Sequence, residues 1–510
     1  MITPGSELSA DAELSCDVCI VGSGAGGSVL AAGLCQAGLD VVMLEEGPYA
    51  TRRDFDLDEQ KAIPMLYQDR GTRSTADLAI TVLQGRSVGG STTVNWTTCF
   101  RTPERILEHW RTVHRIEGLD AASLAPHFDE VERRLNIAPW PEELANPNNR
   151  KILEGARALG WEAGALRRNV KGCADSGYCG LGCPVNGKQA MHLTYIPDAI
   201  AAGLRLYSDV RAERVESAGG RATAVHAVVL DRQSGRPTER RLTVRPKVTV
   251  LAGGAINTPA LLLRSGIEGQ GRVGRRTFLH PVVGIGGLYE EPVLPFKGAP
   301  QSVGSHQFVD RGPDKVGFFF ESAPLQPMLA ALTASLIGKE MARFMGALPN
   351  LGVMIALLVD GLLPEDDGGV VSLRPDGRIR LDYPIRPFLT EAMGSAHIAL
   401  ARLTLAAGAN EALSLHHKPR RMRDVMSMTQ LAEAPYGAHE HAIFTAHQMG
   451  GCAMGPDPAS SVVGTDHRLH GVDNLFVVDG SVLPTALGVN PSETIYGLAH
   501  RARGFVGEAV

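Results

Sequence analysis

A glycine-rich segment near the N-terminus, residues 17–47, constrains the fold of this chain more than any other stretch. Its apolar run at residues 18–21 predicts a buried strand, and a helix-period segment follows. Three glycines separate the two at the spacing GxGxxG, namely Gly22, Gly24 and Gly27. A second apolar strand at residues 41–44 ends at Glu45. Strand, glycine turn, helix, strand and acid in this order predict a dinucleotide-binding βαβ unit.

The chemistry of that unit follows from its backbone. Glycines carry no Cβ, so the backbone N–H groups of the turn can approach a pyrophosphate closely, and the helix dipole favours its negative charge. An acid at the end of the second strand, here Glu45, accepts hydrogen bonds from a ribose. A merely glycine-rich turn would need none of the flanking elements, so we interpret the segment as a nucleotide site.

Length and charge narrow the class of protein. With 510 residues the chain exceeds one ordinary domain, so we expect two modules. The net charge of −5 excludes a nucleic-acid partner, which would call for a basic surface. The first fifteen residues lack a basic start and an apolar core, so we expect a cytoplasmic protein. Charged residues and prolines interrupt the apolar region 325–364, which predicts membrane association that is at most peripheral.

The remainder of the chain alternates between regular and irregular patterns. Residues 84–101 combine a Gly-Gly pair, hydroxyls and the amide of Asn95, which suits a loop that wraps a polar ligand. Residues 223–230 and 241–250 predict a hairpin of strands. The mixed pattern at residues 293–431 indicates a substrate-binding insertion.

Four separated stretches give the chain a family resemblance. They are GSGAGG with LEEG, GRSVGGSTTVN, GGAINTPALLLRSGI and a C-terminal stretch that begins HQMGG. In sequence and in order they resemble the glucose–methanol–choline (GMC) flavin oxidoreductases, over essentially the full length of the chain. The resemblance implies an α/β fold, with a doubly wound Rossmann-type FAD-binding domain assembled from discontinuous segments and a sheet-containing α+β substrate-binding domain. The expected segments are FAD-binding 1–165, a cysteine-containing insertion 166–203, FAD-binding 204–292, substrate-binding 293–431 and FAD-binding 432–510.

By this resemblance the cofactor is FAD. The three glycines of the first motif would contact its pyrophosphate, and Glu45 its adenosine ribose. Further residues expected along the cofactor are Arg86, Gly89, Gly90, Ser91, Asn95, Asp479 and Gly480. Some relatives attach FAD through a histidine at the position of Val94, so we expect non-covalent FAD here.

The resemblance also assigns the chemistry. An alcohol loses a hydride from carbon and a proton from oxygen, so the site needs a base and a group that steers the oxygen. His447, in HQMGG, matches the catalytic histidine of the family as base or alkoxide stabiliser, and Asn490, in GVNP, matches its partner. Flavin N5 would take the hydride from a primary or secondary alcohol. The apolar region around residues 325–363 favours a lipophilic alcohol.

Three cysteines, Cys173, Cys179 and Cys183, form a GC-x5-C-x3-CP insertion. It resembles a branch with long-chain alcohol oxidases, and also FAD glucose dehydrogenase catalytic subunits, in which such cysteines hold a three-iron four-sulfur cluster. A cluster would pass electrons to an acceptor protein or a quinone, making the enzyme a dehydrogenase. A tightly packed loop and a disulfide are the alternatives.

Two other classes of function fit parts of the sequence. A lyase of the same superfamily, such as a hydroxynitrile lyase or a fatty-acid decarboxylase, would keep the fold and FAD. A flavin-binding protein without turnover would keep FAD alone, but the presence of both His447 and Asn490 argues against it. His439 and His441 match no helical zinc motif.

Overall fold

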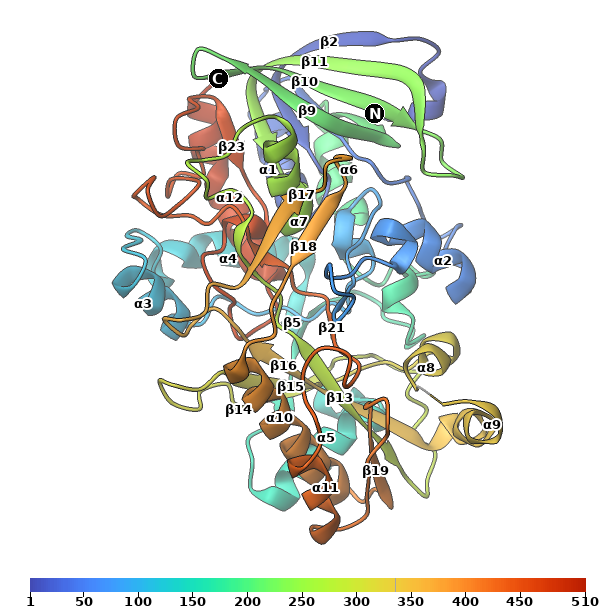
Figure 1. Ribbon diagram of the computed structural model, residues 1–510. Coiled ribbons are helices and arrows are strands. Elements are labelled where there is room, and N and C mark those ends of the chain that lie inside the picture. Colours follow the sequence, from blue (N-terminus) through green and yellow to red (C-terminus); the bar gives the residue numbers. More distant parts are fainter. Residues whose placement is uncertain (335) are drawn as a thin grey trace.

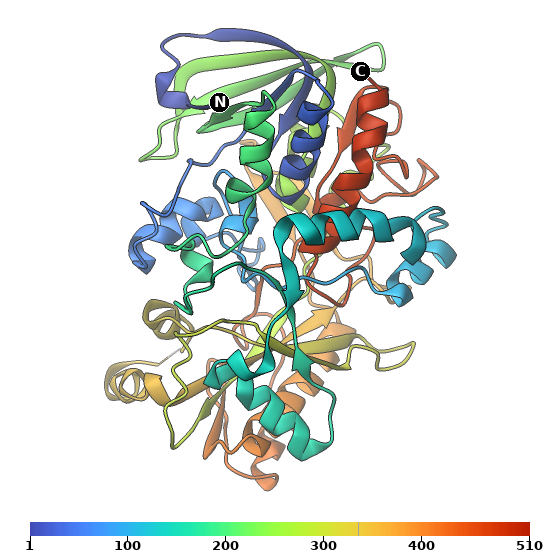
Figure 2. The same ribbon diagram turned by 180° about the vertical axis from the view of Figure 1, so that it is seen from behind.

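A computed structural model describes residues 1–334 and 336–510. Two large β-sheets dominate it, one at each end of an elongated molecule (Figure 1). The view from behind shows both termini at the end that holds the first sheet (Figure 2). The α/β fold class predicted from the sequence is confirmed.

The first sheet has eight strands in the order β1 (Ile2–Pro4), β8 (Arg205–Ser208), β3, β2, β11, β10 and β9 (Val210–Ala218), with β23 beside β11. The predicted βαβ unit forms its centre: β2 (Ala12–Val21), helix α1 (Ala25–Gln36) and β3 (Val41–Leu44). The pairs β2–β3, β2–β11 and β11–β23 are all parallel, with β11 at Pro237–Leu251 and β23 at Leu475–Val477. The predicted hairpin is also present, as β10 (Arg221–Leu230) and β11.

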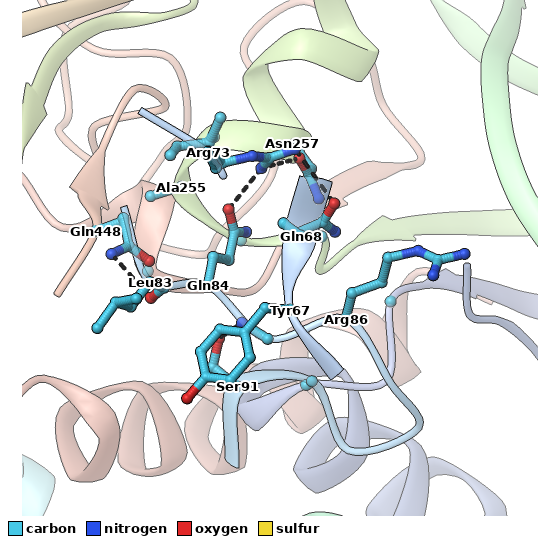
Figure 3. Close-up of a pocket in the computed structure, with 18 of the residues that line it drawn as sticks. Tyr67, Gln68, Arg73, Leu83, Gln84, Arg86, Ser91, Ala255, Asn257 and Gln448 are labelled. Atoms are coloured by element: carbon cyan, nitrogen blue, oxygen red, sulfur yellow. Dashed lines mark hydrogen bonds between the residues drawn. The ribbon is translucent and has the colours of Figure 1, made fainter. Parts of the chain in front are cut away.

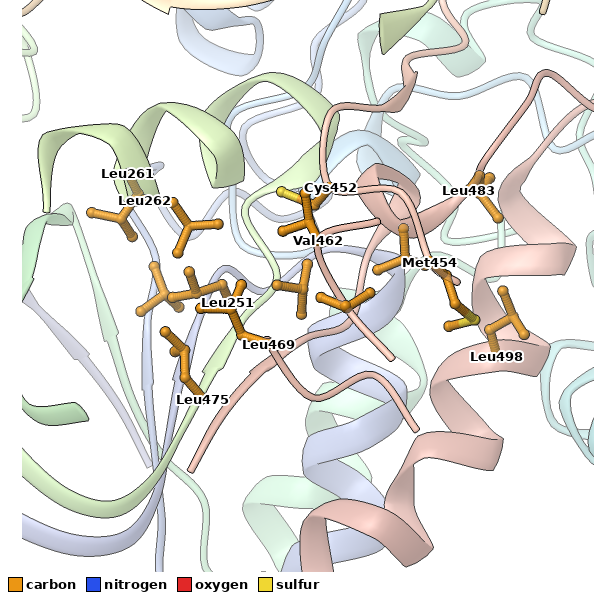
Figure 4. Packing of buried hydrophobic residues seen from close by; sticks show 14 of the residues in the cluster. Leu251, Leu261, Leu262, Cys452, Met454, Val462, Leu469, Leu475, Leu483 and Leu498 are labelled. Carbon is orange, nitrogen blue, oxygen red and sulfur yellow. The ribbon is translucent and has the colours of Figure 1, made fainter. Parts of the chain in front are cut away.

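Both faces of this sheet are buried by helices. Successive side chains of a strand point to opposite faces, so each strand contributes to two clusters. Val18 and Ile20 of β2 pack with α1 and with α12 (Ser492–Glu508) in one cluster. Leu251 of β11 packs on the other side with the helix α7 (Gly254–Arg264). Figure 4 shows Leu251 near the leucines of α7. The helices thus cover the sheet and leave its carboxyl edge to the loops.

The second sheet has nine strands. Seven follow the order β20 (Arg421–Met422), β19 (Glu411–Ser414), β13, β16, β15, β14 (Val303–Phe308) and β6 (Gly164–Ala165), and β21 (Phe444–Thr445), which pairs with β13, and β4 (Thr81–Val82) lie beside this path. Its central strand β16 (Leu351–Val359) is buried along its full length and pairs with β13 (Val282–Leu288) and β15 (Gly317–Ser322). Helices α5 (Pro147–Leu159) and α10 (Pro387–Ala406) cover one face. The opposite face looks toward the first sheet.

The predicted module boundaries stay a prediction. Strand β13 lies inside the predicted segment 204–292, yet it pairs with β16 and so belongs to the second sheet. Within residues 1–334 and 336–510, no helix has both the length and the apolar character to cross a membrane.

Candidate functional site

A cavity of about 1130 Å³ lies between the two sheets. It opens at the carboxyl ends of β2, β3, β11 and β23, where Gly22, Glu45, Ala252 and Asp479 line it. Parallel strands place such loops at one edge, which is where α/β sheets bind ligands. The second sheet contributes apolar lining from β16, including Ile355. The cavity exceeds the roughly 300–1,000 Å³ of ordinary ligand pockets, so it can hold a large group and a second molecule.

Glycine is required at the base of the cavity. Gly22 has φ +104°, and a Cβ there would lie 2.3 Å from the Ala252 carbonyl oxygen. A Cβ on Gly90 would lie 2.7 Å from the Gly24 Cα, so the first two glycine motifs touch. Gly26, which the GxGxxG spacing does not single out, is equally tight, because its Cβ would lie 1.8 Å from the Val478 carbonyl oxygen. Backbone therefore lines the cavity here, as a pyrophosphate site needs.

Two other predicted glycines play a supporting part. Gly27 packs beneath the turn, where a Cβ would lie 2.1 Å from the Gly22 carbonyl oxygen. The N–H of Gly89 donates to Ser23 Oγ at 3.0 Å. Both glycines were expected to contact the cofactor, but neither lines the cavity in the described part of the chain.

Glu45 lies at the cavity wall and braces the glycine turn. Its carboxylate accepts from the Ser23 N–H at 3.0 Å, from Ser23 Oγ at 2.6 Å and from the Gly47 N–H at 2.8 Å. Burial raises the pKa of Glu45, and the hydrogen bonds from Ser23 and Gly47 oppose this rise. Contact between Glu45 and a ribose stays a prediction.

A polar group that the sequence did not predict lines the same cavity (Figure 3). The Arg73 guanidinium donates to Gln84 Oε1 at 2.6 Å, to Asn257 Oδ1 at 2.9 Å and to Gln68 Oε1 at 3.2 Å. Gln68, Arg73 and Gln84 belong to one stretch of the chain, whereas Asn257 lies 184 positions from Arg73, so no local pattern predicts that the four meet. Predicted Arg86 lies in the lining and donates to the Glu46 carbonyl oxygen at 2.9 Å.

Asp479 ties the C-terminal segment to the start of α7. It accepts from the Gly254 N–H at 2.8 Å, from Thr258 Oγ1 at 2.6 Å and from the Ser481 N–H at 2.8 Å. The predicted residues Gly480, Ser91 and Asn95 also line the cavity. Asn95 Oδ1 is buried and has no hydrogen-bond partner within the described chain, so it is available to a ligand.

His447 and Asn490, the predicted catalytic pair, meet at the cavity wall. The Asn490 Nδ2 lies 3.3 Å from His447 Nε2. The His447 N–H donates to Thr445 Oγ1 at 3.1 Å, which fixes the loop that follows β21 (Phe444–Thr445). Desolvation lowers the pKa of His447 to about 3, so the imidazole is neutral near pH 7. The pair therefore presents neutral polar atoms to the cavity, beside Ile355.

The far side of His447 contacts a residue absent from the predicted site. His280 Nδ1 lies 3.1 Å from His447 Nδ1. The two histidines are 167 positions apart, and His280 carries no motif that the sequence analysis used.

The structure does not support a metal site at the three cysteines of the insertion. Cys179 is buried in a short 3-10 turn, Cys179–Leu181, while Cys173 and Cys183 are partly exposed. No group of three or more His, Cys, Asp or Glu side chains in the described residues is arranged to hold a metal ion, so the iron–sulfur alternative is unsupported. All eight cysteines lie in the described ranges and are free thiols, so no disulfide joins them there.

Contacts to a buried lysine explain why the insertion packs as a loop. Lys188 Nζ donates to the carbonyl oxygens of Cys179 at 2.7 Å, Asn95 at 3.0 Å and Thr93 at 2.5 Å. Backbone carbonyls around an ammonium group, rather than converging sulfurs, organise this segment and attach it to the cavity wall.

Known proteins share both the sequence and the fold. Residues 63–282 match the N-terminal domain of the GMC oxidoreductases, and residues 364–499 match the C-terminal domain. An uncharacterized GMC-type oxidoreductase of Mycobacterium tuberculosis is 35% identical over 95% of this chain and 74% of its own. The long-chain-alcohol oxidase FAO4A of Arabidopsis thaliana is 29% identical over 98% of this chain and 69% of its own.

The 2-methyl-1,2-propanediol dehydrogenase of Mycolicibacterium austroafricanum is 26% identical over 96% of this chain and 95% of its own. In structure, the chain resembles pyridoxine 4-oxidase from Mesorbium loti, with a TM-score of 0.70 and 19% identity over 96% of this chain and 98% of that one. Family match and relatives together confirm the resemblance seen in the motifs. The chain belongs to the GMC oxidoreductase family.

Proposed function

We propose that this protein oxidises a primary or secondary alcohol to the carbonyl compound with non-covalently bound FAD. The observation that carries the proposal is the position of the His447–Asn490 pair on the wall of a cavity whose base is a glycine-lined dinucleotide cradle. Alcohol oxidases and a diol dehydrogenase among the relatives support an alcohol substrate.

The residues present fit FAD. The tight glycines at the base of the cavity suit a pyrophosphate, and the unpartnered Asn95 Oδ1 suits a polar ring edge. Val94, which lines the cavity, offers no nucleophile for a covalent link. When bound, FAD supplies the hydride acceptor.

The chain's own residues hold the alcohol oxygen. His447 Nε2 and the Asn490 amide converge on one point of the wall, where they can hydrogen-bond that oxygen and stabilise negative charge on it. His447 acts there as base or as alkoxide stabiliser. The apolar lining from β16, with Ile355 and Leu357, favours a substrate with a lipophilic body.

Anaerobic mixing of the purified flavoprotein with alcohols such as 1-octanol, geraniol and benzyl alcohol tests the proposal. At least one alcohol should bleach the oxidised flavin absorbance and yield the aldehyde in equal amount. The variants H447Q and N490A should retain the flavin spectrum and lose the bleaching. A lyase would convert its substrate while the flavin remains oxidised.

A further inference from the structure

His280 is fully buried and held in an unusual backbone conformation. It lies between β12 (Arg275–Phe278) and β13, and its φ of 43° falls in the left-handed region. Residues other than glycine adopt that region in only a few per cent of cases, and a buried one needs surrounding contacts that hold it there.

Asp360 enforces the conformation. Its carboxylate accepts from the His280 N–H at 3.0 Å, from the Leu279 N–H at 2.8 Å and from the Tyr383 hydroxyl at 2.6 Å. Asp360, His280 and Leu279 are fully buried and Tyr383 is only 3% exposed, so this group of hydrogen bonds is isolated from solvent. The backbone of His280 is therefore held by buried hydrogen bonds, and its ring lies behind His447, which lines the cavity.

The hydrogen bonds of the His280 ring have a fixed direction. The Gly488 N–H, which can only donate, lies 3.2 Å from His280 Nε2. His280 is neutral, because burial and then the nearby His447 and Arg105 lower its pKa well below the usual value. With Nε2 accepting, the single ring proton lies on Nδ1. His280 Nδ1 therefore donates to His447 Nδ1 at 3.1 Å.

The hydrogen bond from His280 also determines the tautomer of His447. A neutral His447 that accepts at Nδ1 carries its own proton on Nε2, the nitrogen that faces Asn490. Two N–H groups cannot bond each other, so the Asn490 amide must present its oxygen to His447. A 180° rotation of the amide group brings Oδ1 to His447, and it breaks no hydrogen bond of Oδ1, which has no other partner among the described residues.

We propose that His280 is a positioning residue that holds His447 in the Nε2-protonated tautomer. The proposal rests on the function proposed above and decides between the two roles of His447. A nitrogen that already carries a proton meets the alcohol as a donor, so His447 stabilises the alkoxide and the hydroxyl proton passes to solvent. His280 keeps its proton throughout.

Histidine NMR of the holoenzyme tests the tautomer without any substrate. In ¹⁵N-histidine-labelled protein near neutral pH, with His447 assigned by its loss in H447Q, the His447 signals should report a proton on Nε2. The H280N variant keeps an N–H in place of the His280 Nδ1 donor and should preserve that tautomer. The H280L variant removes the donor and should give a mixture. A proton on His447 Nδ1 in the wild type would overturn the proposal.

Anaerobic flavin reduction by an alcohol supplies the second measurement. H280L should retain FAD and react about 10- to 100-fold more slowly, the loss expected for one buried hydrogen bond, whereas H280N should stay within about threefold of wild type. H306L is the matched control, because His306 packs on the same Phe319, with ring centroids 5.4 Å apart, and makes no bond to His447. H306L should react like wild type.

The outcomes separate the two proposals. If H280L keeps both the wild-type tautomer and the wild-type rate, His280 has no positioning role. If no alcohol reduces the wild-type flavin, the proposed function fails while the NMR result still decides the tautomer. If H280L loses FAD, the wild-type and H280N spectra decide alone.

Discussion

The Asn490 Nδ2 lies 3.3 Å from His447 Nε2, although the two residues are 43 positions apart and belong to different loops. Each comes from a glycine-rich turn, which lets the backbone bend sharply and aim the side chain at the cavity. His447 follows β21, which pairs with β13 of the second sheet, so the contact joins the turn that holds Asn490 to that sheet.

Removing either member of the pair should slow chemistry far more than binding. H447Q and N490A should each lower the rate constant of anaerobic flavin reduction by about 10²–10³-fold, the usual loss for one donor to a developing oxyanion. Flavin content and thermal midpoint should stay near wild type. Stopped-flow absorbance measures the effect, and a loss below fivefold in both variants would contradict the assignment.

Gly90 gives a test of the cofactor cradle. In G90A the added methyl would lie 2.7 Å from the Gly24 Cα, at a φ of +55°, so the two glycine loops must separate. We expect FAD affinity to fall by at least tenfold, measured by fluorescence titration of the apoprotein.

The control for G90A is G118A. Gly118 also has a positive φ, of +73°, but nothing lies within 4 Å of its Cβ position. This variant should lose only about 1 kcal/mol of unfolding free energy and should bind FAD normally. Equal FAD loss in both variants would show that backbone strain, rather than the contact between loops, is responsible.

The local motifs predicted the centre of the first sheet and its glycine turn, because a βαβ unit is formed by consecutive residues and leaves a continuous pattern in the sequence. Glycines 22, 24 and 90 and Glu45 all line one cavity, and their contact with FAD stays a prediction. His447 and Asn490 were predicted through the family resemblance, which carries information that spacing alone does not.

The rest depended on contacts between distant segments. His280 meets His447 across 167 positions, and Arg73 meets Asn257 across 184. Neither contact leaves a periodic or motif signal in the sequence. At the cysteine insertion, by contrast, the sequence did carry a motif, but the motif did not decide between a cluster, a packed loop and a disulfide. Its spacing suggested a metal, whereas the fold uses the loop carbonyls to bind Lys188.

Glu321 gives a pH test of the buried site. It lies on β15 opposite Ile355 of β16, whose side chain lines the cavity, and cross-strand partners share a face. Burial raises the pKa of Glu321 from 4.5 to about 8, and Asn490 opposes this rise. Within the described chain neither carboxyl oxygen reaches hydrogen-bond geometry with a partner.

A raised pKa means that the folded protein binds this proton more tightly than the unfolded chain. The contribution of Glu321 to stability is therefore present below pH 4.5 and is lost as the pH rises toward 8. Glutamine does not ionise, so E321Q does not show this loss. The unfolding free energy of E321Q minus that of wild type should therefore be larger at pH 8 than at pH 5, by about 1–3 kcal/mol. Urea unfolding at both pH values measures it. An unchanged difference would show that Glu321 is ionised in the folded state.

Buried neutral histidines predict sensitivity to acid. The pKa values of His441 and His467 are both lowered to about 4, chiefly by burial. The unfolded chain binds these protons near pH 6.5, so stability should fall as the pH drops from 6.5 to 4. H441Q should flatten this fall, as measured by thermal unfolding across that range. A variant at the exposed His439 should leave it unchanged.

The central claim is that an alcohol bound beside His447 reduces FAD held in the glycine-lined cavity. The most direct measurement is the visible spectrum of the purified holoenzyme, mixed anaerobically with 1-octanol and the other test alcohols, in wild type and H447Q. The account predicts rapid loss of the oxidised flavin bands in wild type with at least one alcohol, with matching aldehyde or ketone, and little change in H447Q. A wild-type flavin that stays oxidised with every alcohol, or equal bleaching of H447Q, would contradict it.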